Sequence, residues 1–226
     1  MTSRNLDSFA PAFNRAVSAY KAGNLAEAEQ LCQQIVSARS DHFDALHVLA
    51  IVQAALGKSP PALANYDRAL ALRPDHADAL SNRGNTLLAL NRCEEALASY
   101  DRALAVRPDF AEALSNRGHA LERADRLDEA LASYDRALAL QPRHVMAHCN
   151  AAALRLLRGD FPRGWPDYEW RWMKESVVLA NRMFTQPLWR GEPIAGKTIL
   201  LHGEQGLAIR FNSAAMCRWS PRAARA

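Results

Sequence analysis

Apolar residues of this chain recur at helical spacing, and the whole pattern repeats along the sequence. Leu80, Leu87 and Leu90 fall on one face of a predicted helix. The stretch that follows has an apolar face of its own, formed by Ala96, Tyr100, Ala103 and Leu104. Shifted by 34 residues, segments 77–110 and 111–144 are identical at 21 of 34 positions. A period of this length predicts a stack of helix–turn–helix units.

The interval extends over most of the chain, with prolines at the same position in three units: Pro74, Pro108 and Pro142. We therefore predict an all-α solenoid over residues 9–178, made of repeats 9–42, 43–76, 77–110, 111–144 and 145–178. The first repeat is degenerate, because Cys32 replaces the tyrosine and Ser40 the proline. Repeat positions are numbered below from the first residue of each repeat.

Local signals predict where the helices begin and end. Asp75 and Asp109 follow their prolines as predicted N-caps, and Glu112 would complete a capping box with Asp109. Asn91 is expected to end a first helix in the left-handed conformation. In the second repeat, Gly57 is predicted to end the first helix, Ser59 to cap the second helix and Pro60 to begin it.

Small residues indicate close packing between the two helices of a repeat. Gly84 and Gly118 lie in mid-helix, where glycine costs about 1 kcal/mol relative to alanine, so we expect a neighbouring helix backbone to approach there. The second helices carry small residues at Ala62, Ala96 and Ala130. The bulk that fills the space between units is predicted to come from Tyr66, Tyr100 and Tyr134.

These residues resemble the tetratricopeptide repeat (TPR), which has small residues at positions 8, 20 and 27, an aromatic residue at 24 and proline at 32. Two repeats match in full, with Gly84, Ala96, Tyr100, Ala103 and Pro108, and with Gly118, Ala130, Tyr134, Ala137 and Pro142. They depart from the family at position 7, where Arg83 and Arg117 replace the usual leucine. The resemblance implies a right-handed superhelix whose first helices line a concave groove for a peptide or a partner protein.

An asparagine recurs at position 6 of four repeats, at Asn14, Asn82, Asn116 and Asn150, and Val48 interrupts the series. This series is similar to the asparagine ladder of O-linked N-acetylglucosamine transferases, which implies binding of an extended peptide backbone through side-chain amides. Duplication of the repeats explains the asparagines equally well. Further groove contacts, or ordinary solvated positions, are Asp78, Ser81, Asn85, Glu112, Ser115, His119 and Arg123.

Beyond residue 158 the composition changes, since all five tryptophans follow Gly164. We expect residues 159–172 to cover the end of the solenoid. Residues 179–207 form a predicted linker and a first strand at 197–202, and the segment resembles the junction of bacterial TPR–glycosyltransferase fusions. Residues 191–198 match a phosphate-loop pattern, but the predicted strand follows the pattern instead of preceding it, which argues against a nucleotide hydrolase. Residues 208–226 are predicted to be an out-of-frame or disordered tail, produced by a base lost after Leu207.

Charge and candidate chemistry narrow the functional classes. The net charge of +4 comes from four arginines after residue 204, because the other 24 basic residues balance the 24 acidic ones. Nucleic acid is therefore not an expected partner. We see neither a membrane span nor a secretion signal, and the cysteines match no disulfide or zinc spacing, so we expect a cytoplasmic protein. His144, His148 and Cys149 lack a neighbouring carboxylate ligand, so no metal site is expected.

The sequence thus predicts a non-enzymatic module without cofactor or catalytic residues, which binds a protein or an extended peptide. The alternative is a truncated glycosyltransferase-related protein, whose repeats present peptides to a catalytic domain absent from this chain.

Overall fold

The structure is a computed structural model that describes residues 9–173. This part of the chain is helical throughout and contains no strand, which confirms the all-α prediction. The predicted strand at 197–202, the linker and the tail lie outside the described residues. The helices are α1 (Ala10–Lys21), α2 (Leu25–Ala38), α3 (Phe43–Ala55), α4 (Ser59–Leu72), α5 (Ala77–Ala89), α6 (Cys93–Val106), α7 (Ala111–Arg123), α8 (Leu127–Leu140), α9 (Val145–Leu157), α10 (Phe161–Tyr168) and the 3-10 helix η1 (Glu169–Met173).

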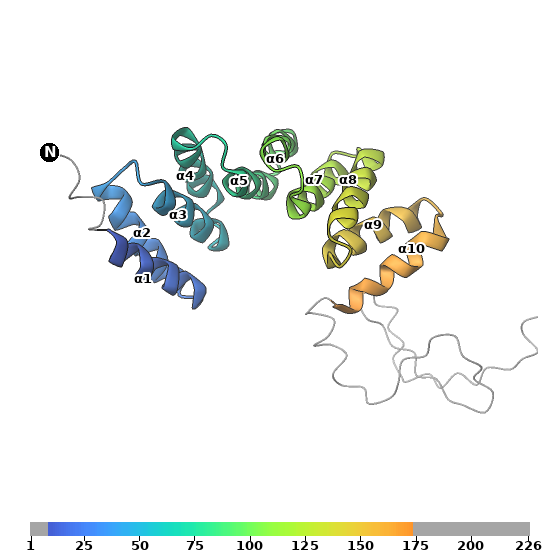
Figure 1. Ribbon diagram of the computed structural model, residues 1–226, viewed down its shortest axis with the longest axis horizontal. Helices are drawn as coiled ribbons and strands as arrows, with labels where there is room; N and C mark the ends of the chain where they lie inside the picture. The colour runs from blue at the N-terminus through green and yellow to red at the C-terminus, as the bar shows by residue number, and fades with distance from the viewer. Residues whose placement is uncertain (1–8, 174–226) are drawn as a thin grey trace, which may run out of the picture. The chain divides into compact units, whose positions relative to one another are not determined.

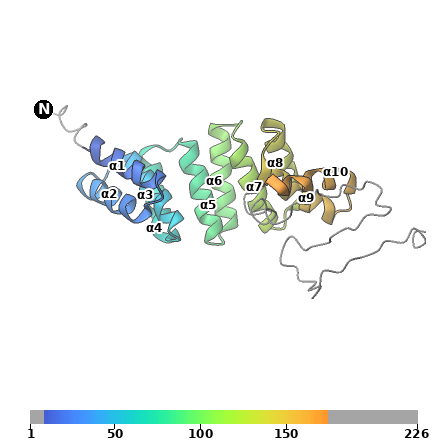
Figure 2. The ribbon, with the colours of Figure 1, turned by 90° about the horizontal axis from the view of Figure 1, so that it is seen from below.

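The helices up to Tyr168 form one unit and stack in sequence order, each packing on the next (Figure 1). Consecutive first helices of the repeats (α1, α3, α5, α7 and α9) also touch one another, whereas consecutive second helices do not. Figure 2 shows the pairs side by side along the row. The first helices are therefore closer together than the second helices, and their exposed faces form the inner side of the stack. The 3-10 helix η1 belongs to a separate unit.

The turn inside each repeat uses a left-handed residue at position 15. Asn91 has φ of 60°, as predicted, and Asp125 takes the same conformation in the next repeat. Glycine fills this position in the other repeats, with φ between 74° and 80° at Gly23, Gly57 and Gly159. A left-handed residue at the end of a first helix reverses the chain, so that the second helix packs back on the first.

Histidines cap three of the first helices, and the predicted aspartate caps are wrong. His76 Nδ1 accepts a hydrogen bond from the backbone N–H of Ala79 at 3.2 Å, so His76 is the N-cap and Asp75 lies one residue too early. His42 and His144 cap α3 and α9 in the same way. Helix α7 begins after Phe110 without a side-chain cap, so Asp109 and Glu112 form no capping box.

Two further local predictions also need correction. Ser59 is the first residue of α4, whose N-cap is Lys58, so the serine does not cap that helix. Gly84 faces a side chain instead of a helix backbone, because a Cβ there would lie 2.6 Å from Cε1 of Tyr100. Gly118 and Tyr134 repeat the arrangement. Each tyrosine ring is fully buried against the glycine of its own repeat, and so fills the space within a unit.

Candidate functional site

The recurring asparagines lie on the inner side of the stack, one in each of α1, α5, α7 and α9. Asn14 is exposed, and Asn82, Asn116 and Asn150 are partly buried. Asn82 Nδ2 lies 3.5 Å from Nε2 of His47, and Asn150 lies near the Tyr134 hydroxyl, which donates to Oε2 of Glu122 at 3.0 Å. Within residues 9–173, the Asn116 amide has no hydrogen-bond partner. The position that breaks the series, Val48, lies on α3.

A hollow of about 490 Å³ opens between α7 and α9, next to the loop that follows α8. Four of the predicted site residues border it: Ser115, Asn116, His119 and Asn150. The rest of its lining combines charged, polar and apolar side chains, from Glu112, Gln141, Arg143, His144, Val145 and Met146. Its volume lies within the range of ligand-binding pockets, roughly 300–1,000 Å³. The structure therefore brings together half of the predicted site.

The other predicted residues lie on α1 and α5, outside this hollow. Ser81 is buried, as is Ser115, so neither offers much surface to a ligand. The Tyr100 hydroxyl donates to Oδ1 of Asn85 at 2.6 Å, which engages one end of that amide within its own repeat. Asn14 and Asn82 belong to earlier repeats, and their part in binding stays a prediction.

The second repeat carries a histidine where the third and fourth carry Ser81 and Ser115. The His47 ring packs against those of Phe43 and His76, with centroids 5.8 Å and 5.2 Å away, and these two rings also contact each other at 4.8 Å. Burial, and secondarily the neighbouring His76, lowers the pKa of His47. The inner side at this junction is thus filled by packed aromatic rings, unlike the surface above Ser115.

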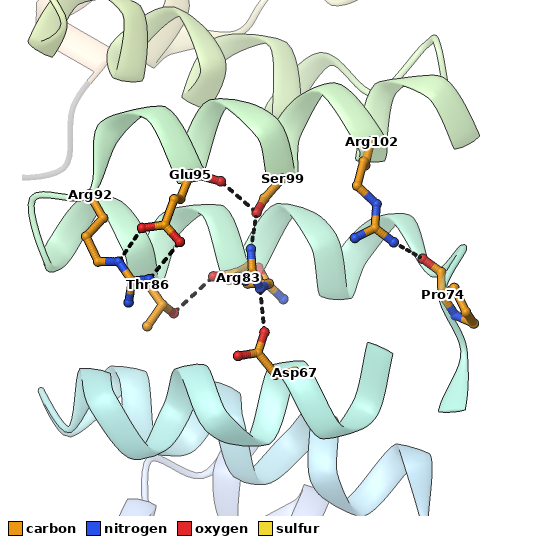
Figure 3. Close-up of polar contacts among 9 residues, drawn as sticks. Asp67, Pro74, Arg83, Thr86, Arg92, Glu95, Ser99 and Arg102 are labelled. Carbon is orange, nitrogen blue, oxygen red and sulfur yellow. Dashed lines mark hydrogen bonds and ion pairs between the residues drawn. The ribbon is translucent and has the colours of Figure 1, made fainter. Parts of the chain in front are cut away.

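Arginines at position 7, where the family usually has leucine, connect adjacent repeats. The Arg83 guanidinium donates from Nε to Asp67 of the preceding repeat at 2.7 Å, and from Nη1 to Ser99 of its own repeat at 2.6 Å (Figure 3). Arg117 repeats both bonds, with Asp101 and Ser133, at 2.7 Å each. We call these contacts the inter-repeat clamp. The aspartates recur at the 34-residue interval, and that signal would have revealed the clamp from the sequence.

The fifth repeat builds its clamp from a different position. Position 7 there is Ala151, and Arg155, one helical turn later, donates to both Asp135 of α8 and Asp167 of α10. Arg155 is buried and Asp167 nearly so, whereas Asp135, like the aspartates of the other clamps, is about half-exposed. His148 Nδ1 also lies 2.8 Å from Asp167. These contacts hold α10 as the second helix of the fifth repeat.

The histidines considered as metal ligands serve other purposes. His144 caps α9 through Nδ1, while His148 contacts Asp167 and the backbone carbonyl of Pro142. The expectation that no carboxylate lies near these histidines is therefore wrong, because Asp167 of α10 packs against α9. No group of three or more His, Cys, Asp or Glu side chains in residues 9–173 is arranged to hold a metal ion. Of the helices described, none has the length and apolar character needed to span a membrane.

Comparisons with known proteins agree with the repeat geometry. One tetratricopeptide repeat model matches residues 81–145 and 116–164, and a second TPR repeat model matches residues 52–91. No curated protein sequence matches the chain. The matched segments end at residue 164, so the resemblance to TPR–glycosyltransferase fusions, which depends on later residues, stays a prediction.

Solved structures with the same fold include MamA, residues 41 to the end, from Desulfovibrio magneticus RS-1. It has a TM-score of 0.64 and 20% identity, over 78% of this chain and 98% of that one. YrrB, described as a TPR protein with an unusual peptide-binding site, has a TM-score of 0.60 and 20% identity, over 79% of this chain and 90% of that one. With the 34-residue period, the buried tyrosine–glycine pairs and the two matching family models, the chain belongs to the tetratricopeptide repeat proteins.

Proposed function

We propose that this protein is a scaffold that binds an extended peptide along the inner side of its first helices. The observation that carries the proposal is the hollow between α7 and α9, which gathers Asn116, Asn150 and His119 at one accessible place. An asparagine side chain offers both a donor and an acceptor, so it can bind a peptide backbone regardless of the peptide's side chains. The peptide-binding site named for YrrB, which has the same fold, supports this class of ligand.

The asparagines alone account for weak binding. A net gain of about 0.5–1.5 kcal/mol per hydrogen bond gives a few kcal/mol for the four asparagines together, which corresponds to roughly millimolar affinity. Additional contacts, supplied by the other residues of the hollow, are needed for tight binding.

The combined substitution Asn82→Ala and Asn116→Ala tests the proposal. Loss of two hydrogen bonds, about 2 kcal/mol, should weaken peptide binding roughly thirtyfold by fluorescence polarisation. The melting temperature should fall by no more than a few degrees, because neither amide makes a short hydrogen bond with the described residues. Asn24→Ala removes an amide in the turn between α1 and α2 and serves as the control. Unchanged affinity in the double variant would leave repeat duplication as the whole explanation of the asparagines.

A further inference from the structure

The loops between repeats carry a charge pattern that changes at the hollow. In the first three loops an arginine and an aspartate stand two residues apart, as Arg39 and Asp41, Arg73 and Asp75, and Arg107 and Asp109. The fourth loop has Gln141 and Arg143 at these two positions. Compared with the first three loops, the fourth loop therefore has no positive charge at position 31. At position 33 it has a positive charge in place of a negative one.

In the second and third repeats, the arginine at position 31 neutralises the acid at position 2 of its own repeat. Arg107 donates to both carboxylate oxygens of Asp78, at 3.1 Å and 2.8 Å, and this bond holds the pKa of Asp78 below its ordinary value. In the second repeat, Nη1 of Arg73 lies 3.5 Å from Oδ1 of Asp44. The equivalent acid of the fourth repeat is Glu112, and Gln141 gives it no compensating charge.

Glu112 and Arg143 both border the hollow, but they do not neutralise each other. Within residues 9–173, neither makes a hydrogen bond or an ion pair with another side chain, and both are exposed. The same hollow presents the amides of Asn116 and Asn150 and the apolar side chains of Val145 and Met146. The second and third repeats tie their position-2 acids, Asp44 and Asp78, to an arginine, whereas the fourth repeat leaves Glu112 and Arg143 available to a ligand.

We infer that the hollow accepts an extended peptide of mixed charge, which places a basic side chain against Glu112 and an acidic side chain against Arg143. The inference rests on the proposed peptide-binding function and specifies its ligand. The asparagine amides bind the peptide backbone, which is the same in every peptide. The charges of Glu112 and Arg143 determine which peptide side chains are preferred. Each charge contact at a solvent-accessible position strengthens binding roughly fivefold and weakens as salt is added.

Selection from a random dodecapeptide phage library on the full chain tests this specificity. The wild-type protein should enrich peptides with a lysine or arginine at a fixed separation from an aspartate or glutamate. Glu112→Gln should remove the basic preference alone, and Arg143→Gln the acidic preference alone. The combined variant Glu112→Lys with Arg143→Glu should enrich the reverse order of charges. Asp75→Asn, a charge removed from an earlier loop, should select the same peptides as the wild type.

Affinities of one selected peptide, measured by fluorescence polarisation, should fall roughly fivefold in each single variant. Circular dichroism should be unchanged, since both side chains are exposed and unbonded. Enrichment of peptides without a charge preference would overturn the inference and leave the proposed function standing. Failure to enrich any peptide would overturn both.

Discussion

The buried arginine of the last repeat offers the sharpest test of how the stack is held together. Arg155 is 8% exposed and connects Asp135, 44% exposed, with Asp167, 15% exposed. Arg155→Met keeps the apolar stem of the side chain and removes the guanidinium group with its charge and its donors. The carboxylate of Asp167 then remains among packed helices with His148 as its described partner.

The magnitude follows from the burial of the pair. Removing one partner of a buried ion pair typically costs about 3–5 kcal/mol, because the other charge is left uncompensated. Since His148 still contacts Asp167, we expect the lower end of this range, about 3 kcal/mol. Arg158→Met is the matched control, because Arg158 pairs with Asp128, which is 89% exposed. An exposed pair is worth about 1 kcal/mol or less.

Hydrogen exchange measured by mass spectrometry locates the effect. Each repeat of a solenoid contacts only its neighbours, so the loss should be confined to the end that Arg155 holds. We expect amides of α9 and α10 to exchange roughly a hundredfold faster in Arg155→Met, and those of α3 and α5 to keep their rates. Equal exchange in Arg155→Met and Arg158→Met would refute the reasoning, as would a uniform acceleration along the chain.

Two further predictions concern the core. Gly118→Ala should lower the free energy of unfolding by about 1 kcal/mol in urea titrations. The new Cβ would lie 2.5 Å from the Tyr134 ring, and such overpacking costs about 1–3 kcal/mol. This cost outweighs the gain of about 1 kcal/mol in helix propensity. A more stable variant would contradict this. Cys32 is fully buried, and burial raises the pKa of its thiol to about 11, so at pH 8 iodoacetamide should modify the partly exposed Cys93 long before Cys32. Peptide mapping identifies the modified residue, and equal rates would count against the buried position.

Much of the fold was predictable, because repetition copies helix spacing, turns and core residues together. The left-handed Asn91 and the buried Tyr100 follow from their positions in the repeat. The histidine cap at His76 was missed, because aspartate is the commoner cap and an imidazole caps only when the loop places Nδ1 over the helix end. The sequence predicts a helix backbone next to Gly84, whereas the structure places the Tyr100 ring there. A glycine indicates only that a neighbouring group comes close, and does not identify that group.

The site was harder to predict than the fold. The asparagine interval predicts a binding surface along the first helices, but several residues at equivalent positions have different surroundings. Ser115 borders a hollow, while His47 fills the corresponding place with its ring. Arg155 could not be identified from the period, because it reaches its aspartates from position 11 instead of position 7.

The hollow shares α9 with the clamp of Arg155, and this gives the arginine an influence on a ligand it does not touch. A peptide bound between α7 and α9 requires α9 and α10 to be folded. Its apparent dissociation constant therefore rises as the fraction of molecules with this helix pair folded falls. Conversely, the peptide stabilises the pair by mass action. If the proposed peptide binds there, its occupancy and the folding of α9 and α10 are thermodynamically linked, and the stability of this helix pair sets the fraction of molecules that can bind.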